Sequence, residues 1–130
     1  MAAPLNKILH VEDEPDIQEV AKMALEAVGG FTVKTCGSGD EALAAALEFG
    51  PDLFLLDVMM PGMDGPTTFQ KLRELPGLEN TCGVFMTAKV MESEVRRFMN
   101  LGALGVLPKP FDPMTLSDQL RDIWDSQDKS

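Results

Sequence analysis

The chain has 130 residues, of which 45% are hydrophobic and 25% charged, and its formal net charge is −10. This hydrophobic fraction argues against disorder, and the length suits one domain with its own core. The acidic balance argues against nucleic-acid binding, which needs a basic face, and no apolar run approaches the ~18 residues of a membrane span.

Five short runs rich in β-branched residues, Leu and Phe predict strands. In chain order they are Lys7 to Val11, Phe31 to Thr35, Leu53 to Leu56, Val84 to Met86 and Leu104 to Leu107. They recur about every 20–30 residues, which is the spacing of βα units in a parallel sheet. The third run is apolar without alternation, as expected of a central strand that is buried on both faces.

A stretch with helical periodicity follows each predicted strand. The apolar positions are Ile17, Val20, Ala21, Ala24 and Val28; Ala42, Leu43, Ala46 and Leu47; Phe69 and Leu72; Met91, Val95, Phe98 and Met99; and Leu116, Leu120, Ile123 and Trp124. The expected boundaries are Gly29-Gly30 at the end of the first helix, a Ser38–Glu41 capping box, Pro66 in a first turn, Pro76-Gly77, and Gly102. We interpret the Met, Phe and Trp residues among them as core.

Five successive βα units predict an α/β fold. Five strands are too few for an eight-stranded barrel, so we expect an open, doubly wound parallel sheet with helices on both faces. The flavodoxin-like strand order 2-1-3-4-5 fits a five-stranded unit. The two cysteines, Cys36 and Cys82, lack metal-ligand spacing, and the N-terminus lacks the features of a secretory signal. We therefore expect reduced cysteines and a cytoplasmic location.

Polar residues follow four of the predicted strands. The first strand runs into Glu12-Asp13-Glu14, and the third, fourth and fifth run into Asp57, Thr87 and Lys109. Ligands bind outside the carboxyl ends of parallel strands, at the point where the strand order reverses. Because strands one and three are neighbours in the expected order, Glu12, Asp13 and Asp57 should converge there, flanked by Thr87 and Lys109.

Three carboxylates in one crevice repel one another unless cations neutralise them. Lys109 supplies one positive charge, and Mg²⁺ suits a site made of carboxylates, water and a phosphoryl oxygen. An aspartate in this setting can accept a phosphoryl group, with Thr87 donating a hydrogen bond to it. Each residue alone also fits a plainer role: a solvated acidic loop, a turn, a helix cap or a surface lysine. Their joint occurrence at four strand ends favours the phosphoryl site. We interpret His10, a lone histidine within the first strand, as a half-buried sheet residue rather than a ligand, and assign it no role.

Four segments together resemble the receiver domain of two-component response regulators, the CheY-like family. They are Ile8 to Glu14, Leu56 to Gly65, Met86 to Ala88 and Leu107 to Phe111. The resemblance covers nearly the whole chain and implies a single receiver domain over residues 1–130, with no output domain. It implies a signalling phosphoacceptor rather than an enzyme.

The resemblance also implies the role of each site residue. Asp57 would take its phosphoryl group from a phosphohistidine of a sensor histidine kinase or phosphotransfer protein. Asp13 directly, Glu12 through water, Asp57 and the backbone carbonyl of Met59 would hold Mg²⁺. Thr87 and Lys109 would contact the phosphoryl group, and the Lys109–Pro110 bond would be cis. A downstream protein would bind the face formed by the fourth helix, fifth strand and fifth helix, with no contact to nucleic acid or membrane.

Two residues depart from the family pattern. Val106 stands where relatives carry Tyr or Phe, and Pro108 lies within the fifth strand, which a sheet edge tolerates. Val106 is too short and stiff to make the inward swing of an aromatic ring. We therefore expect the readout of phosphorylation to rest on the loop from Ala88 to Glu92 and the helix after it. The alternative is that Phe85 or Phe98 replaces the missing ring.

The sequence leaves two rival functions to weigh. A Mg²⁺-dependent phosphohydrolase with an aspartyl nucleophile generally needs a second Asp two residues later as general acid. Met59 occupies that position and cannot donate a proton. A non-phosphorylated pseudo-receiver would not need the complete set of site residues.

Overall fold

The computed structural model describes residues 4–127, and within them five parallel strands form one sheet in the order β2-β1-β3-β4-β5. The predicted α/β fold and strand order are therefore confirmed. The elements are β1 (Lys7–Val11), α1 (Pro15–Met23), η1 (Ala24–Val28), β2 (Thr32–Cys36), α2 (Gly39–Phe49), β3 (Leu53–Asp57), α3 (Gly65–Leu72), β4 (Cys82–Thr87), α4 (Glu92–Asn100), β5 (Gly105–Pro108) and α5 (Leu116–Ser126).

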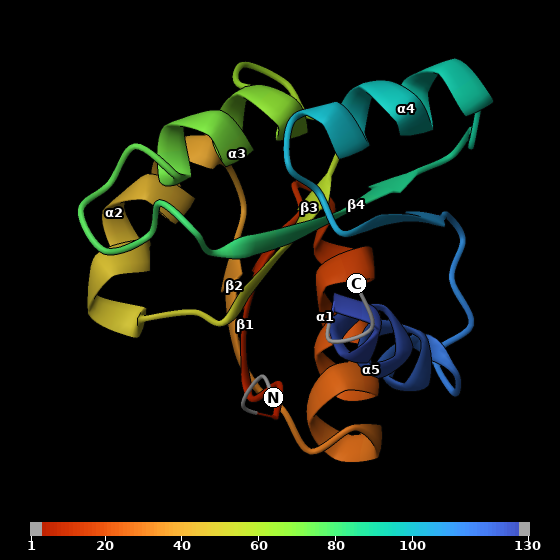
Figure 1. The fold of residues 1–130 in the computed structure, drawn as a ribbon. Coiled ribbons are helices and arrows are strands. Elements are labelled where there is room, and N and C mark those ends of the chain that lie inside the picture. Colours follow the sequence, from red (N-terminus) through yellow and green to blue (C-terminus); the bar gives the residue numbers. More distant parts are fainter. Residues whose placement is uncertain (1–3, 128–130) are drawn as a thin grey trace.

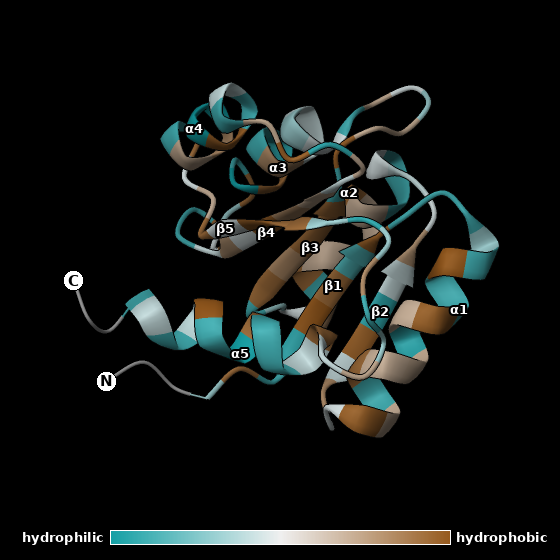
Figure 2. Ribbon diagram, turned by 90° about the vertical axis from the view of Figure 1, so that its right-hand side faces the viewer, coloured by the Kyte–Doolittle hydropathy of each residue, from teal (hydrophilic) through white to brown (hydrophobic). Residues whose placement is uncertain are grey.

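The sheet lies between two layers of helices (Figure 1). Helices α2, α3 and α4 cover one face over a core that includes Leu9, Phe54 and Phe85, and α1, η1 and α5 cover the other over Ile8 and Leu55. All five residues of β3 are buried, as predicted for the central strand. Figure 2 shows the inner strands largely hydrophobic, whereas the helices alternate between polar and apolar residues, because only one side of each helix meets the sheet.

Four of the five strands differ from their predicted bounds, and β3 differs only in that it also includes Asp57. Strand β2 begins at Thr32 rather than Phe31, because the Phe31 amide bonds to the Leu25 carbonyl at the end of the preceding helix, while the Thr32 amide bonds to Asn6. Strand β4 extends one or two residues beyond each predicted end. Strand β5 begins at Gly105 and includes Pro108, which the edge position permits.

The first helical stretch is not a uniform α-helix. It passes from α1 into the π-helix η1, in which each turn holds an extra residue, before Gly29 ends it as predicted. The predicted capping box forms only in part. Ser38 Oγ accepts the Glu41 amide at 3.1 Å, but the Glu41 carboxylate accepts the amide of Gly37 instead of Ser38.

Helix α3 begins as the sequence predicts and ends earlier. Asp64 caps it by accepting the Thr67 amide at 2.9 Å, and Pro66 lies in its first turn. The helix ends at Leu72, before the predicted Pro76-Gly77 stop. Among the residues that the structure describes, no helix is both long and apolar enough to cross a membrane.

Candidate functional site

Hydrogen bonding between the parallel strands places the predicted site residues together at the carboxyl ends of these strands. Glu12 follows β1, Asp57 and Thr87 are the last residues of β3 and β4, and Lys109 follows β5. Their backbones are held to the neighbouring strands. The Glu12 amide bonds to Cys36 at 3.0 Å, and the Lys109 amide bonds to Thr87 at 2.8 Å. These positions follow from hydrogen bonding in the sheet, so the side chains project from a rigid base.

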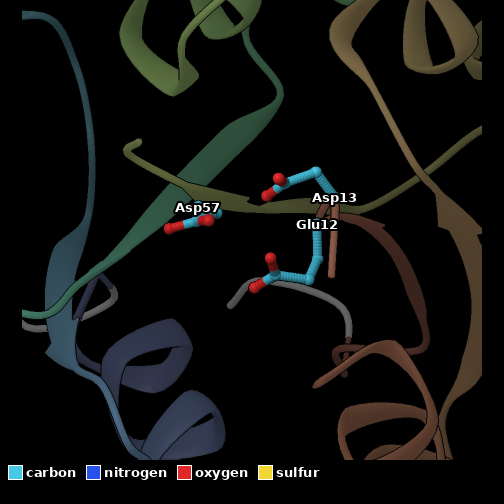
Figure 3. Close-up of side chains that lie close together, drawn as sticks. All are labelled: Glu12, Asp13 and Asp57. Atoms are coloured by element: carbon cyan, nitrogen blue, oxygen red, sulfur yellow. The ribbon is translucent and has the colours of Figure 1, made fainter. Parts of the chain in front are cut away.

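Three carboxyl groups from two neighbouring strands meet at these strand ends. Ligand oxygens of Glu12, Asp13 and Asp57 all lie within 4.8 Å of one another. Figure 3 shows the three side chains directed at a common space. Glu12 and Asp57 are buried and Asp13 is half-buried. The convergence expected from the strand order is thus present.

Lys109 joins two of these carboxylates. Its Nζ lies 3.0 Å from Oε1 of Glu12 and 3.2 Å from Oδ2 of Asp57. The second oxygen of Glu12 accepts the Glu14 amide at 3.2 Å. A charged hydrogen bond of this kind offsets part of the cost of burying a carboxylate. The Lys109–Pro110 bond is cis, as the resemblance implied.

For both Glu12 and Lys109, burial shifts the pKa in one direction and the neighbouring opposite charge shifts it in the other. Burial raises the pKa of Glu12 to about 7, and its hydrogen bonds from Lys109 and Glu14 only partly oppose that rise. Burial alone would lower the pKa of Lys109, but its hydrogen bonds to Glu12 and Asp57 outweigh burial and raise it. His10, which we expected to be only half-buried, is completely buried. Burial and then the Lys109 charge lower its pKa to about 4, so it stays neutral beneath the site.

Thr87 and Met59 lie at the rim of the site. Both line a groove of about 730 Å³ that also contains Asp57 and Lys109. The Thr87 hydroxyl donates to the Lys89 carbonyl at 3.2 Å and accepts the Lys89 amide at 3.3 Å, so it is engaged with its own loop. The Met59 side chain is 78% exposed, and the use of its backbone carbonyl as a metal ligand remains a prediction.

Two residues that shape the site were not recognised from the sequence. A Cβ at Gly65 would collide with the Asp57 carbonyl, so this glycine lets α3 start directly against the strand end. Gln18 on α1 donates its side-chain amide to the Glu12 carbonyl at 2.5 Å. Glycine in the Asp64-Gly65 pair was a visible signal for a close backbone approach, whereas nothing distinguished Gln18 from other surface residues.

The donor set fits a hard divalent cation. All three converging side chains offer carboxylate oxygens, the ligands that Mg²⁺ takes together with water, and neither thiol nor imidazole belongs to the cluster. Lys109 balances one of the three negative charges that these groups carry when ionised. A divalent ion would balance the other two.

Comparisons with known proteins agree with this geometry. Residues 8–121 match the family model described as the response regulator receiver domain. The chain is 35% identical over 131 residues to the transcriptional regulatory protein CpxR of Klebsiella pneumoniae, covering 97% of this chain and 54% of that protein. It is 38% identical over 117 residues to the phosphate regulon regulator PhoB of Rhizobium meliloti, covering 90% and 51%.

A solved structure shares the whole fold. The chemotaxis protein CheY4 of Vibrio cholerae superposes with a TM-score of 0.85 at 30% identity, covering 92% of this chain and 98% of that one. The chain spans about half the length of the curated relatives that it matches.

The raised pKa of Glu12 predicts a pH dependence of stability. A carboxyl group whose pKa is higher in the folded state binds more protons there between about pH 4.5 and 7, so the free energy of unfolding falls as pH rises through that window. Urea unfolding with a chelator present should show the stability of the native chain, relative to Glu12→Gln, falling by on the order of 2 kcal/mol from pH 5 to pH 8. The exposed control Glu19→Gln should leave the pH profile unchanged. A difference between the native chain and Glu12→Gln that stays constant or grows with pH would contradict a raised pKa at Glu12.

Proposed function

The chain is a receiver domain of the response-regulator family of two-component signalling, and on that premise we propose that Asp57 accepts a phosphoryl group from a histidine. The observation that carries the proposal is the pairing of Lys109 with both Asp57 and Glu12 within a group of three converging carboxylates. Such a site can neutralise a phosphoryl group next to a nucleophilic oxygen.

In the proposed reaction, a carboxylate oxygen of Asp57 forms a bond to phosphorus while the N–P bond of the donor phosphohistidine breaks. The electron pair of that bond returns to the donor imidazole, and the product is an aspartyl phosphate. Little further covalent chemistry is needed, because phosphoryl transfer depends chiefly on positioning and on charge neutralisation. The rigid end of β3 holds Asp57 in place, and the groove gives the donor access.

Mg²⁺ is the cation that we propose for the site, held by Asp13 and Asp57, by Glu12 through water and by the carbonyl of Met59. When bound, it neutralises phosphoryl oxygens. Glu12, with a pKa of about 7, is partly protonated at neutral pH in the absence of metal. A nearby divalent cation favours the ionised form of a carboxyl group, so Glu12 would release a proton as metal binds, and binding would be tighter at higher pH.

Lys109 and Thr87 would act on the transferred group. Lys109 Nζ already lies 3.2 Å from Asp57 and needs little movement to contact a phosphoryl oxygen. Thr87 would have to exchange its two bonds with Lys89 for a hydrogen bond to that oxygen. The loop after β4 therefore changes its contacts when Asp57 changes its state.

The proposed partners follow from this chemistry. The donor is a sensor histidine kinase or phosphotransfer protein in the cytoplasm, and a downstream protein binds the face of α4, β5 and α5. The acidic balance of the chain argues against direct contact with nucleic acid. Phosphohydrolase activity is the weaker candidate, because Met59 offers no proton to a leaving group.

Asp57 is predicted to be the only residue that becomes phosphorylated. Acetyl phosphate with Mg²⁺ should add one phosphoryl group to the intact chain, as measured by mass spectrometry. Asp57→Asn should take up none, whereas Asp40→Asn, at an exposed position of α2, should behave like the native chain. Undiminished uptake in Asp57→Asn would show that the acceptor lies elsewhere.

Mg²⁺ is predicted to stabilise the fold, because it relieves repulsion among the three carboxylates. At a concentration one hundred times the dissociation constant, linkage predicts a gain of about 2.7 kcal/mol. Thermal unfolding with and without Mg²⁺ should show this gain in the native chain and in the exposed control Asp16→Asn. It should be mostly absent in Asp13→Asn, and an equal gain in that variant would argue against the site.

A further inference from the structure

One side chain of helix α4 (Glu92–Asn100) is fully buried in the core. Of its nine residues, all of which the structure describes, Phe98 is the one that is buried, with 1% of its surface exposed. The N-cap residue, Met91, makes no side-chain capping bond. A helix that begins without a side-chain cap and buries a single side chain gives up little buried surface when it changes its orientation.

The ring of Phe98 packs against the strand that ends at Thr87. Its centroid lies 4.8 Å from that of Phe85 on β4, with the two planes inclined by 41°. Phe85 and Thr87 are two residues apart on one strand, so their side chains project from the same face of the sheet. A movement of Thr87 at the end of β4 therefore takes place on the face of the sheet against which Phe98 packs.

The same ring also reaches the proposed reaction site. Phe98 lines the groove that contains Asp57, Thr87 and Lys109. Its outer side is covered by the guanidinium of Arg97, 5.5 Å from the ring centroid, which pairs with Glu94 on the helix surface. One aromatic side chain thus lies between the groove and the exposed face of α4.

The neighbouring strand does not carry a ring that could do this. In the register of the sheet Phe85 is opposite Val106 on β5, and the half-buried Val106 packs against the core cluster that contains Phe85 and Phe98. A valine has a single stiff χ1 torsion and no ring to reorient. Of the two rings that the sequence offers in its place, Phe85 and Phe98, Phe98 is the one that also lines the groove.

We propose that Phe98 is a positioning residue, the pivot on which α4 turns when Thr87 leaves Lys89 for a phosphoryl oxygen on Asp57. This inference rests on the proposed phosphorylation of Asp57. Loss of the two Thr87–Lys89 bonds frees residues 88–91, and α4 then resettles around the contact between Phe98 and Phe85. The outer face of α4 thereby reports the state of the site as a shift between two packings.

The test uses the full chain, with beryllofluoride and Mg²⁺ as a phosphoryl mimic and amide chemical shifts as the readout. In the native chain we expect changes at Thr87, across residues 88–91 and along α4. In Phe98→Leu the change at Thr87 should persist, while the changes along α4 fall to less than half. The persisting change at Thr87 shows that the site of the variant still binds the mimic.

Phe54→Leu is the matched control, because Phe54 is equally buried but lies at the far end of the series of rings, 6.2 Å from Phe69. It should keep the native response of α4. Phe98→Met also removes the ring but keeps more of the side-chain volume, and we expect it to lose the changes along α4 as Phe98→Leu does. The proposal can therefore be tested even if the leucine variant fails to fold.

An undiminished response of α4 in either Phe98 variant, or an equal loss in Phe54→Leu, would overturn the pivot while leaving the phosphoacceptor intact. Absence of any change at Thr87 in the native chain would overturn both proposals.

Discussion

Lys109 touches two carboxylates at once, and much of the site depends on that contact. Glu12 and Asp57 are buried within a few ångströms of each other and of Asp13, an arrangement in which like charges repel and lost hydration adds to the cost. The ammonium group at 3.0 and 3.2 Å supplies the opposing charge. Even so, burial keeps the pKa of Glu12 near 7, because the hydrogen bonds from Lys109 and Glu14 only partly offset the lost hydration. A divalent cation, as we propose for this site, would supply the further positive charge that the three ionised carboxylates need.

The fold supplies this contact through the sheet rather than through flexible loops. Parallel strands end at a common edge, and the order β2-β1-β3-β4-β5 brings the ends of β1 and β3 together with β4 and β5 beside them. Gly65 allows α3 to begin against Asp57, and the Lys109 amide is bonded to Thr87. The hydrogen-bonded strand ends therefore hold the groups that we propose to react. The response that we propose involves the segment after β4, where Thr87 is bonded to its own loop and α4 buries one ring.

Most of this arrangement was predictable from the sequence, for a physical reason. Hydrophobic periodicity identifies strands and helices, and a parallel sheet with this order converts four strand-end residues into neighbours. What escaped prediction depends on single backbone hydrogen bonds. The π-helix η1, the start of β2 at Thr32 and the bond from Gly37 to Glu41 leave the apolar pattern unchanged. The complete burial of His10 was also missed, because a strand pattern alone does not say how well the helices cover each position.

The most direct measurement of the central claim is to locate the phosphoryl bond itself. Borohydride reduces an aspartyl phosphate to homoserine and so marks the residue that carried the group. After treatment of the native chain with acetyl phosphate and Mg²⁺, peptide mapping by mass spectrometry should find homoserine at position 57 and at no other aspartate. Homoserine at Asp13 or another aspartate, or none in a chain that has gained a phosphoryl group, would contradict the assignment of Asp57 as the acceptor.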